Sequence, residues 1–74
     1  MQREAIELKV WRPRQADPLP EGLAQLDRYL DGLDLGTGTL VVFDRRPSAP
    51  PIGQRTSFST ERTPGGRAIT LLRA

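Results

Sequence analysis

The feature that most constrains this chain is the alternation of apolar and charged residues from Ala5 to Trp11. Residues two apart in a β-strand project from the same face. The alternation therefore predicts a strand with Glu7 and Lys9 side by side, and with the aliphatic residues at even positions packed on the other face. Lys9 is the only lysine of the chain, which otherwise carries positive charge on ten arginines.

Glu7 and Lys9 are compatible with two kinds of chemistry. A carboxylate and an ammonium group presented together can hold a divalent cation and a water molecule for phosphodiester cleavage. They can also form an ordinary ion pair on a solvated strand. The chain has no histidine and no cysteine. This excludes histidine acid–base catalysis, cysteine zinc sites and disulfides.

Length and composition set further limits. The chain has 74 residues with 36% hydrophobic content, which indicates a single domain or part of one, with a small core. No apolar run approaches the ~20 residues needed to cross a bilayer, and the N-terminus lacks a signal-peptide segment. We therefore expect a cytoplasmic protein without a membrane partner.

Two pairs of arginines are candidate contacts to nucleic acid. Arg12 and Arg14 follow the first expected strand, and Arg45 and Arg46 follow the next. The guanidinium group matches phosphate oxygens with parallel hydrogen bonds. Solvated charge at strand ends is the plainer alternative, and the net charge of +2 is too small to decide between them.

The remaining pattern predicts an α+β domain with a β-α-β unit and a C-terminal hairpin. A strand over 3–11 is followed by prolines, and then by leucines at three- and four-residue steps that predict a helix over 20–35. Four consecutive apolar residues predict a strand over 39–44, buried on both faces and parallel to the first. After an irregular connection, a hairpin is expected over 55–73, with Pro64 and Gly65 in a type II turn.

The expected helix carries a polar pair beside its leucine stripe. Gln25 and Tyr29 lie four residues apart and so share one face. An amide and a phenol hydroxyl can orient a metal-bound water or a phosphate, although a half-buried helix border is an ordinary alternative. Gly22 and Gly32 should each weaken the helix by about 1 kcal/mol relative to alanine.

Together, the segments EAIELKVW, GLAQLDRYL and TLVVFD resemble the PD-(D/E)XK nuclease superfamily, specifically its RecB-like branch, over about residues 3–46. The same stretch is similar to the nuclease-like region attached to bacterial AAA-type ATPases. The resemblance implies a partial restriction-endonuclease-like core that cleaves DNA with Mg²⁺. It further implies that Glu7 is a metal ligand, that Lys9 orients or activates the attacking water, and that Gln25 and Tyr29 flank the site.

The chain departs from the superfamily pattern at one point. The superfamily places another acidic residue on a strand before the Glu-x-Lys strand. Here Asp17 comes after that strand, and Glu4 is expected to face away from Glu7. The chain therefore resembles the C-terminal part of a nuclease domain, and we expect it to bind Mg²⁺ weakly and to be inactive alone.

This partial core has consequences for partners. An uncovered sheet edge and apolar face favour pairing with another chain, so we expect a homo-oligomer, most simply a dimer, or docking of a missing N-terminal half. Two other functions stay open. One is a non-catalytic accessory or protein-interaction domain of an AAA-type ATPase, and the other is a DNA-binding module without cleavage.

Overall fold

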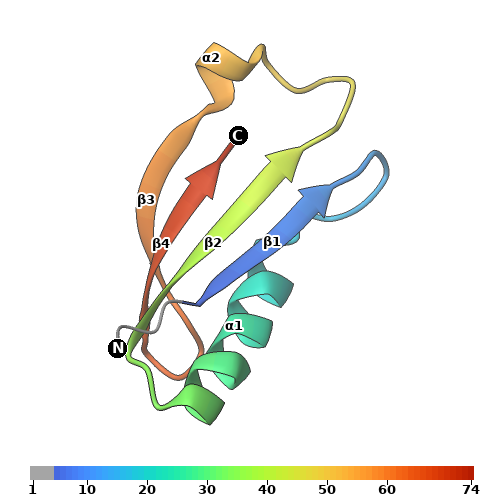
Figure 1. Ribbon diagram of the computed structural model, residues 1–74. Helices are drawn as coiled ribbons and strands as arrows, with labels where there is room; N and C mark the ends of the chain where they lie inside the picture. Colours follow the sequence, from blue (N-terminus) through green and yellow to red (C-terminus); the bar gives the residue numbers. More distant parts are fainter. Residues whose placement is uncertain (1–4) are drawn as a thin grey trace.

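The computed structural model of the protein describes residues 5–74 and contains one four-stranded mixed sheet and one long helix (Figure 1). The α+β class expected from the sequence is confirmed. Arg3 and Glu4, at the start of the expected first strand, lie outside the described residues. In chain order the elements are β1 (Ile6–Trp11), α1 (Leu19–Leu33), β2 (Thr37–Asp44), the short helix α2 (Ile52–Arg55), β3 (Ser57–Arg62) and β4 (Ala68–Arg73).

The strands lie in the order β1-β2-β4-β3. β1 and β2 are parallel and joined through α1, as the sequence predicts. β3 and β4 form the expected antiparallel hairpin. The sequence did not predict that β4 would lie beside β2, parallel to it. This arrangement leaves β1 and β3 as the two edge strands.

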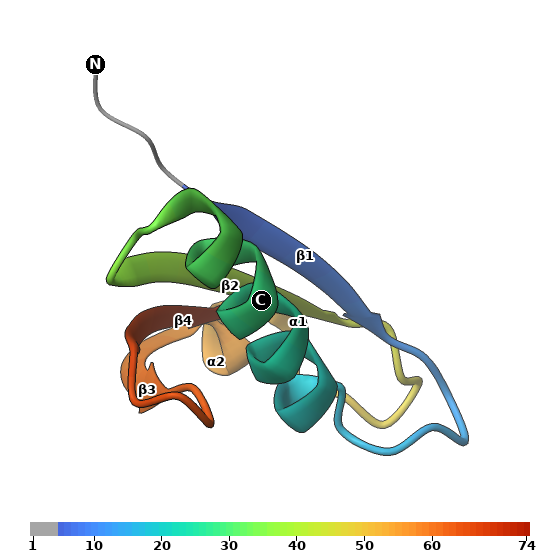
Figure 2. The same ribbon diagram turned by 90° about the horizontal axis from the view of Figure 1, so that it is seen from below.

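The helix α1 covers one face of the sheet (Figure 2). It begins after Pro18, where the Leu19 amide donates to Asp17 Oδ1 over 3.0 Å. Its two fully buried leucines pack on side chains from β2 and β4, which form the centre of the core. The buried core consists of Ala5, Leu26, Leu30, Leu40, Val42, Ile69 and Leu71.

The other face of the sheet has no described element over it. Ile6 and Leu8 of β1 project there and are 60% and 61% exposed. The expectation that the aliphatic residues of the first strand are packed is therefore wrong in this structure. The reason is the register: Glu7 and Lys9 pair with Leu40 and Val42, which point to α1, so the aliphatic residues point away from it.

Two local predictions are corrected by the backbone. The hairpin turn is not type II, because Gly66 and not Gly65 has a positive φ, of 87°. The Gly66 amide donates to Thr63 O over 2.8 Å, which fits a three-residue hairpin loop with a left-handed third residue. The connection after β2 is also not wholly irregular, because it contains α2.

Gly22 allows α1 to lie close to the sheet. A Cβ atom at this position would lie 2.9 Å from Leu40 Cδ1 and 3.4 Å from Lys9 Cγ. At Gly32 the same atom would meet nothing within 4 Å. Both glycines are expected to weaken the helix, but only at Gly22 does close packing explain why a glycine is needed. The absence of a side chain at Gly22 lets the first turn of α1 lie next to Lys9.

Within residues 5–74, no helix is long and apolar enough to cross a membrane.

Candidate functional site

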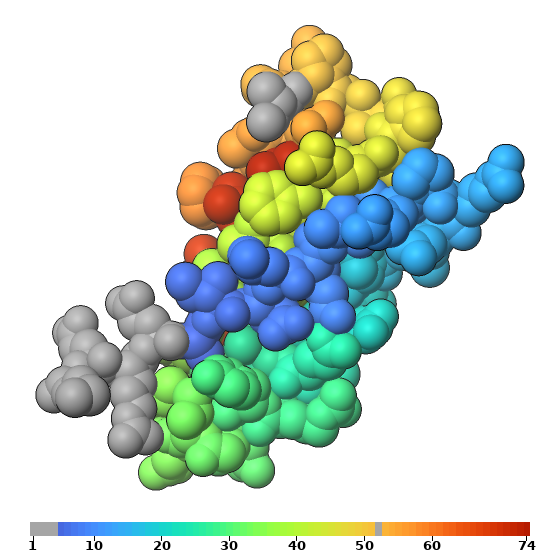
Figure 3. Space-filling view, turned by 45° about the vertical axis from the view of Figure 1, so that its right-hand side comes forward, coloured from blue at the N-terminus to red at the C-terminus, as the bar shows by residue number. Residues whose placement is uncertain are grey.

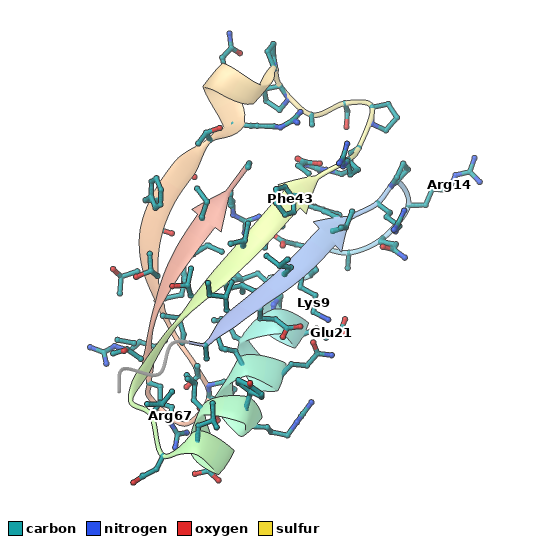
Figure 4. All side chains as sticks on the ribbon, viewed as in Figure 1. Lys9, Arg14, Glu21, Phe43 and Arg67 are labelled. Atoms are coloured by element: carbon teal, nitrogen blue, oxygen red, sulfur yellow. The ribbon has the colours of Figure 1, made fainter. Side chains whose placement is uncertain are left out.

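Lys9 lies between two glutamates at the β1 edge of the sheet. Its Nζ atom is 3.9 Å from Glu7 Oε1 and 3.5 Å from Glu21 Oε1. β1 presents Glu7 and Lys9 on the same face, as the alternation predicts. The first turn of α1 brings Glu21 next to Lys9 (Figure 4). The Lys9 side chain is only 19% exposed, and these two carboxylates are its ion-pair partners among the described residues.

Gln25 joins this group through Glu21. Gln25 Nε2 donates a hydrogen bond to Glu21 Oε1 over 3.2 Å, one helical turn along α1. Lys9 and Gln25 are thus connected through the Glu21 carboxylate, and Glu7 joins them through its ion pair with Lys9. Tyr29 is 58% exposed, and among the described residues we find no hydrogen bond to its hydroxyl.

Glu21 is the residue of this site that the sequence interpretation missed. The nuclease-like pattern contains no acidic residue at this position. One sequence feature could have identified Glu21: it lies four residues before Gln25 and therefore on the same helix face. Its approach to Lys9 depends on the packing of α1 on β1, which spacing alone does not give.

The donor set fits Mg²⁺ in part. Carboxylate oxygens are suitable ligands, and Mg²⁺ is often held by one or two carboxylates together with substrate phosphates. Glu7 and Glu21 supply two, but Lys9 forms ion pairs with both. Over residues 5–74, no three Asp or Glu side chains come together in a group that could hold a metal ion. Glu7 remains the candidate ligand, with Glu21 as the second.

A hollow of about 490 Å³ adjoins Lys9 and Glu21. This volume is within the usual range of small-molecule sites. The loop before α1 forms one wall of the hollow, and a hydrogen bond from Arg73 Nη2 to Asp17 Oδ2, 2.9 Å long, ties this loop to β4. The hollow is lined by Lys9, Val10, Gln15, Ala16, Asp17, Pro18, Pro20 and Glu21.

Three of the four arginines predicted to contact nucleic acid have guanidinium groups without an ion-pair partner among residues 5–74. Arg12, Arg14 and Arg45 are exposed, and we find no ion pair to them within the described part of the chain. The Arg45 amide donates to Trp11 O over 2.8 Å, which places Arg45 beside the start of the loop that carries Arg12 and Arg14. Arg14 points outward from the tip of that loop (Figure 4).

Arg46 is held by structural contacts instead. Its Nε and Nη2 atoms donate to Asp44 over 2.9 and 2.7 Å. Its guanidinium carbon lies 3.4 Å from the centroid of the Trp11 ring, a cation–π contact. These hydrogen bonds lower the pKa of Asp44 to about 2 and raise the pKa of Arg46. Arg46 is therefore less available to a phosphate than its three neighbours.

Comparison of the chain with protein-family models, with curated proteins and with solved structures gives no match. The function must therefore be argued from the residues and their geometry.

Proposed function

We propose that Glu7, Lys9 and Glu21 form part of a Mg²⁺-dependent site for phosphodiester cleavage in DNA. The observation that supports this function is the projection of Glu7 and Lys9 from one face of an edge strand, with Glu21 beside them and a hollow next to Lys9. A bound Mg²⁺ stabilises negative charge on the phosphate. Glu7 holds the cation, and Lys9 donates a hydrogen bond to the phosphate or to the attacking water.

The remaining residues of the proposed site have supporting roles. Gln25 fixes the Glu21 carboxylate by its hydrogen bond. Arg12, Arg14 and Arg45 contact the DNA backbone with their free guanidinium groups. A further carboxylate, from outside the described residues, completes the cation site. In this proposal the 74-residue chain does not cleave DNA alone, because two carboxylates paired with a lysine hold the cation too weakly.

Paramagnetic Mn²⁺ provides the direct test of the cation site. Titrated into the ¹⁵N-labelled chain, Mn²⁺ should broaden the amide signals of Glu7 and Lys9 at lower concentration than those of the rest of the chain. Glu7→Gln should remove this local broadening. Asp34→Asn is the matched control, because Asp34 is an exposed carboxylate at the opposite end of α1. Equal broadening around all exposed carboxylates would contradict the proposal.

Cleavage itself requires the complete site. The chain alone, incubated with plasmid DNA and Mg²⁺ or Mn²⁺, should leave the DNA intact. If a further segment or a partner chain supplies the missing carboxylate, the DNA should be cut, and Lys9→Ala should abolish the cutting. Cutting that persists with Lys9→Ala would contradict the role given to Lys9.

DNA binding without cleavage is the second candidate function, and the free arginines favour it. Neutralising three phosphates gives a slope of about −2.7 for log K against log salt on duplex DNA. The triple alanine variant of Arg12, Arg14 and Arg45 should lose most of this slope in fluorescence anisotropy. Arg28→Ala is the matched control, because Arg28 is an exposed arginine on α1. Salt-dependent DNA binding without cutting, even when a further segment or a partner chain supplies another carboxylate, would favour this second function.

A further inference from the structure

The uncovered face of the sheet carries nearly all of the large apolar side chains that the described residues expose. Six such side chains are exposed among the described residues, and five of them project from this face. Tyr29, on α1, is the sixth. We propose that this face binds a second copy of the chain, so that two sheets stack to form a symmetric dimer. This inference is independent of the proposed nuclease function. The five residues are Ile6, Leu8, Val10, Phe43 and Phe58.

The strand register aligns these side chains into rows that cross the sheet. Leu8 pairs with Val41, Val41 with Leu72, and Leu72 with Phe58. This apolar row spans all four strands, and Val10 and Phe43 continue it on one side. The space-filling view shows β1 and β2 side chains forming one continuous surface that no other described segment covers (Figure 3). Leu8 and Phe58, at the two ends of the row, are therefore available to a partner, whereas Val41 between them is only 9% exposed.

The charge distribution suits a second copy of the same face. Twelve alternate positions, three from each strand, face away from α1 across the paired part of all four strands, and Arg62, at one corner, is the only charged residue among them. Two such faces can meet without opposing like charges, whereas the α1 side of the molecule carries both signs. The twelve are Ile6, Leu8, Val10, Thr39, Val41, Phe43, Phe58, Thr60, Arg62, Ala68, Thr70 and Leu72.

The available area suits a reversible dimer. Four strands about 4.8 Å apart, with six residues rising about 3.3 Å each, give a flat footprint of roughly 380 Å². Side chains standing on the sheet make the accessible area larger than this footprint. Specific complexes bury about 800 Å² per partner, and weaker ones bury less. We therefore expect a dimer that dissociates in the micromolar range or above, and whose population rises with concentration.

The strand order fixes which residues meet in such a dimer. With the two-fold axis parallel to the strands and passing between β2 and β4, each β1 lies opposite the partner's β3. Leu8 then contacts the partner's Phe58, and Val41 contacts the partner's Leu72. Stacked sheets lie about 10 Å apart with interdigitating side chains. This arrangement covers the two most exposed side chains of the row, Leu8 and Phe58, with each other.

Sedimentation equilibrium of the whole chain is the first test. The wild-type protein should show reversible dimer formation from micromolar to millimolar concentration. Leu8→Ser and Phe58→Ser should each weaken the dimer at least tenfold. Tyr29→Ser is the matched control, because Tyr29 is exposed to a similar degree but lies on α1, and it should leave the dimer unchanged. Circular dichroism and Trp11 fluorescence show whether each variant is folded.

Cysteine pairing tests the arrangement, because the chain has no cysteine of its own. Facing residues on sheets about 10 Å apart are too distant for a direct disulfide, so a short bismaleimide bridges the two thiols. An equimolar mixture of Leu8→Cys and Phe58→Cys chains should give the mixed cross-linked dimer faster than either chain is cross-linked to itself. A wild-type chain that stays monomeric into the millimolar range would overturn the proposal and leave the face to a different protein. Preferential pairing of Leu8→Cys with itself, or a dimer insensitive to both serine variants, would also overturn it.

Discussion

Arg67 Nη1 donates to Asp27 Oδ1 over 2.8 Å and so joins the hairpin loop to the middle of α1. The same Asp27 oxygen accepts from Thr63 Oγ1 over 2.6 Å, and Arg67 Nη2 donates to Asp31 over 3.0 Å. This network connects residues far apart in sequence across the end of the sheet. It is the main polar contact between the β3–β4 hairpin and the helix, so it should contribute to the stability of the fold.

The first prediction removes the hydroxyl of Thr63, which is 4% exposed. Thr63→Val loses the hydrogen bond to Asp27 and the one accepted from the Arg67 amide at 3.0 Å. Losing partners of buried polar groups costs about 1–3 kcal/mol, and each kcal/mol lowers Tm by about 4–8 °C in a chain of this size. Thermal unfolding followed by circular dichroism measures the change. Thr37→Val, at an exposed position, should leave Tm nearly unchanged.

The second prediction concerns acid. Hydrogen bonds from Thr63 and Arg67 lower the pKa of Asp27, and those from Arg46 lower the pKa of Asp44 to about 2. A carboxyl group with a lowered pKa in the folded state stabilises the fold above its unfolded pKa, and this stabilisation is lost as pH falls through the folded value. The free energy of unfolding should therefore fall between about pH 4 and pH 2.

Urea unfolding at several pH values, followed by the single tryptophan, measures this dependence. Asp44→Asn should make the fall in stability shallower, because this change removes one of the two carboxyl groups. Asp34→Asn should leave the fall as steep as in the wild type, since the Asp34 side chain has no ion pair with another described residue. A fall that is equally steep with Asp44→Asn would contradict the role given to this pair.

The third prediction compares two glycines of α1. Gly32→Ala should stabilise the protein by up to about 1 kcal/mol, because alanine favours helix and nothing lies nearby. Gly22→Ala should destabilise it in spite of the same helix propensity, because the new methyl group would press on Leu40. Opposite signs of ΔTm are the expected result. Stabilisation by both substitutions would show that α1 can move away from the sheet at little cost.

The fourth prediction uses the ion pairs of Lys9. In the isolated chain, Lys9→Ala should raise the affinity for Mn²⁺, because the ammonium group no longer occupies the space between the Glu7 and Glu21 carboxylates. Lys9→Arg keeps the positive charge and should leave the affinity low. Isothermal titration calorimetry measures both. An affinity that falls with Lys9→Ala would indicate that the two glutamates do not share a cation.

Several features of the fold and the site follow from local patterns in the sequence. The period of two in β1 places Glu7 beside Lys9 whatever the strand pairs with, because it is a property of the extended backbone. The leucine spacing sets the helix, and the long connection through this helix favours a parallel β1 and β2. Spacing also puts Gln25 and Tyr29 on one helix face, although only Gln25 is linked to Lys9, through Glu21.

Other features depend on contacts between distant segments, and only the tertiary structure decided them. The alternation of β1 defines two faces without saying which one α1 covers, and α1 covers the face with the charged residues, leaving Ile6 and Leu8 exposed. Likewise, Arg46 looks equivalent to Arg45 in sequence, but Asp44 and Trp11 hold it in place. Local backbone geometry fixes the direction of each side chain relative to its own element, whereas burial and ion pairing depend on which elements pack together.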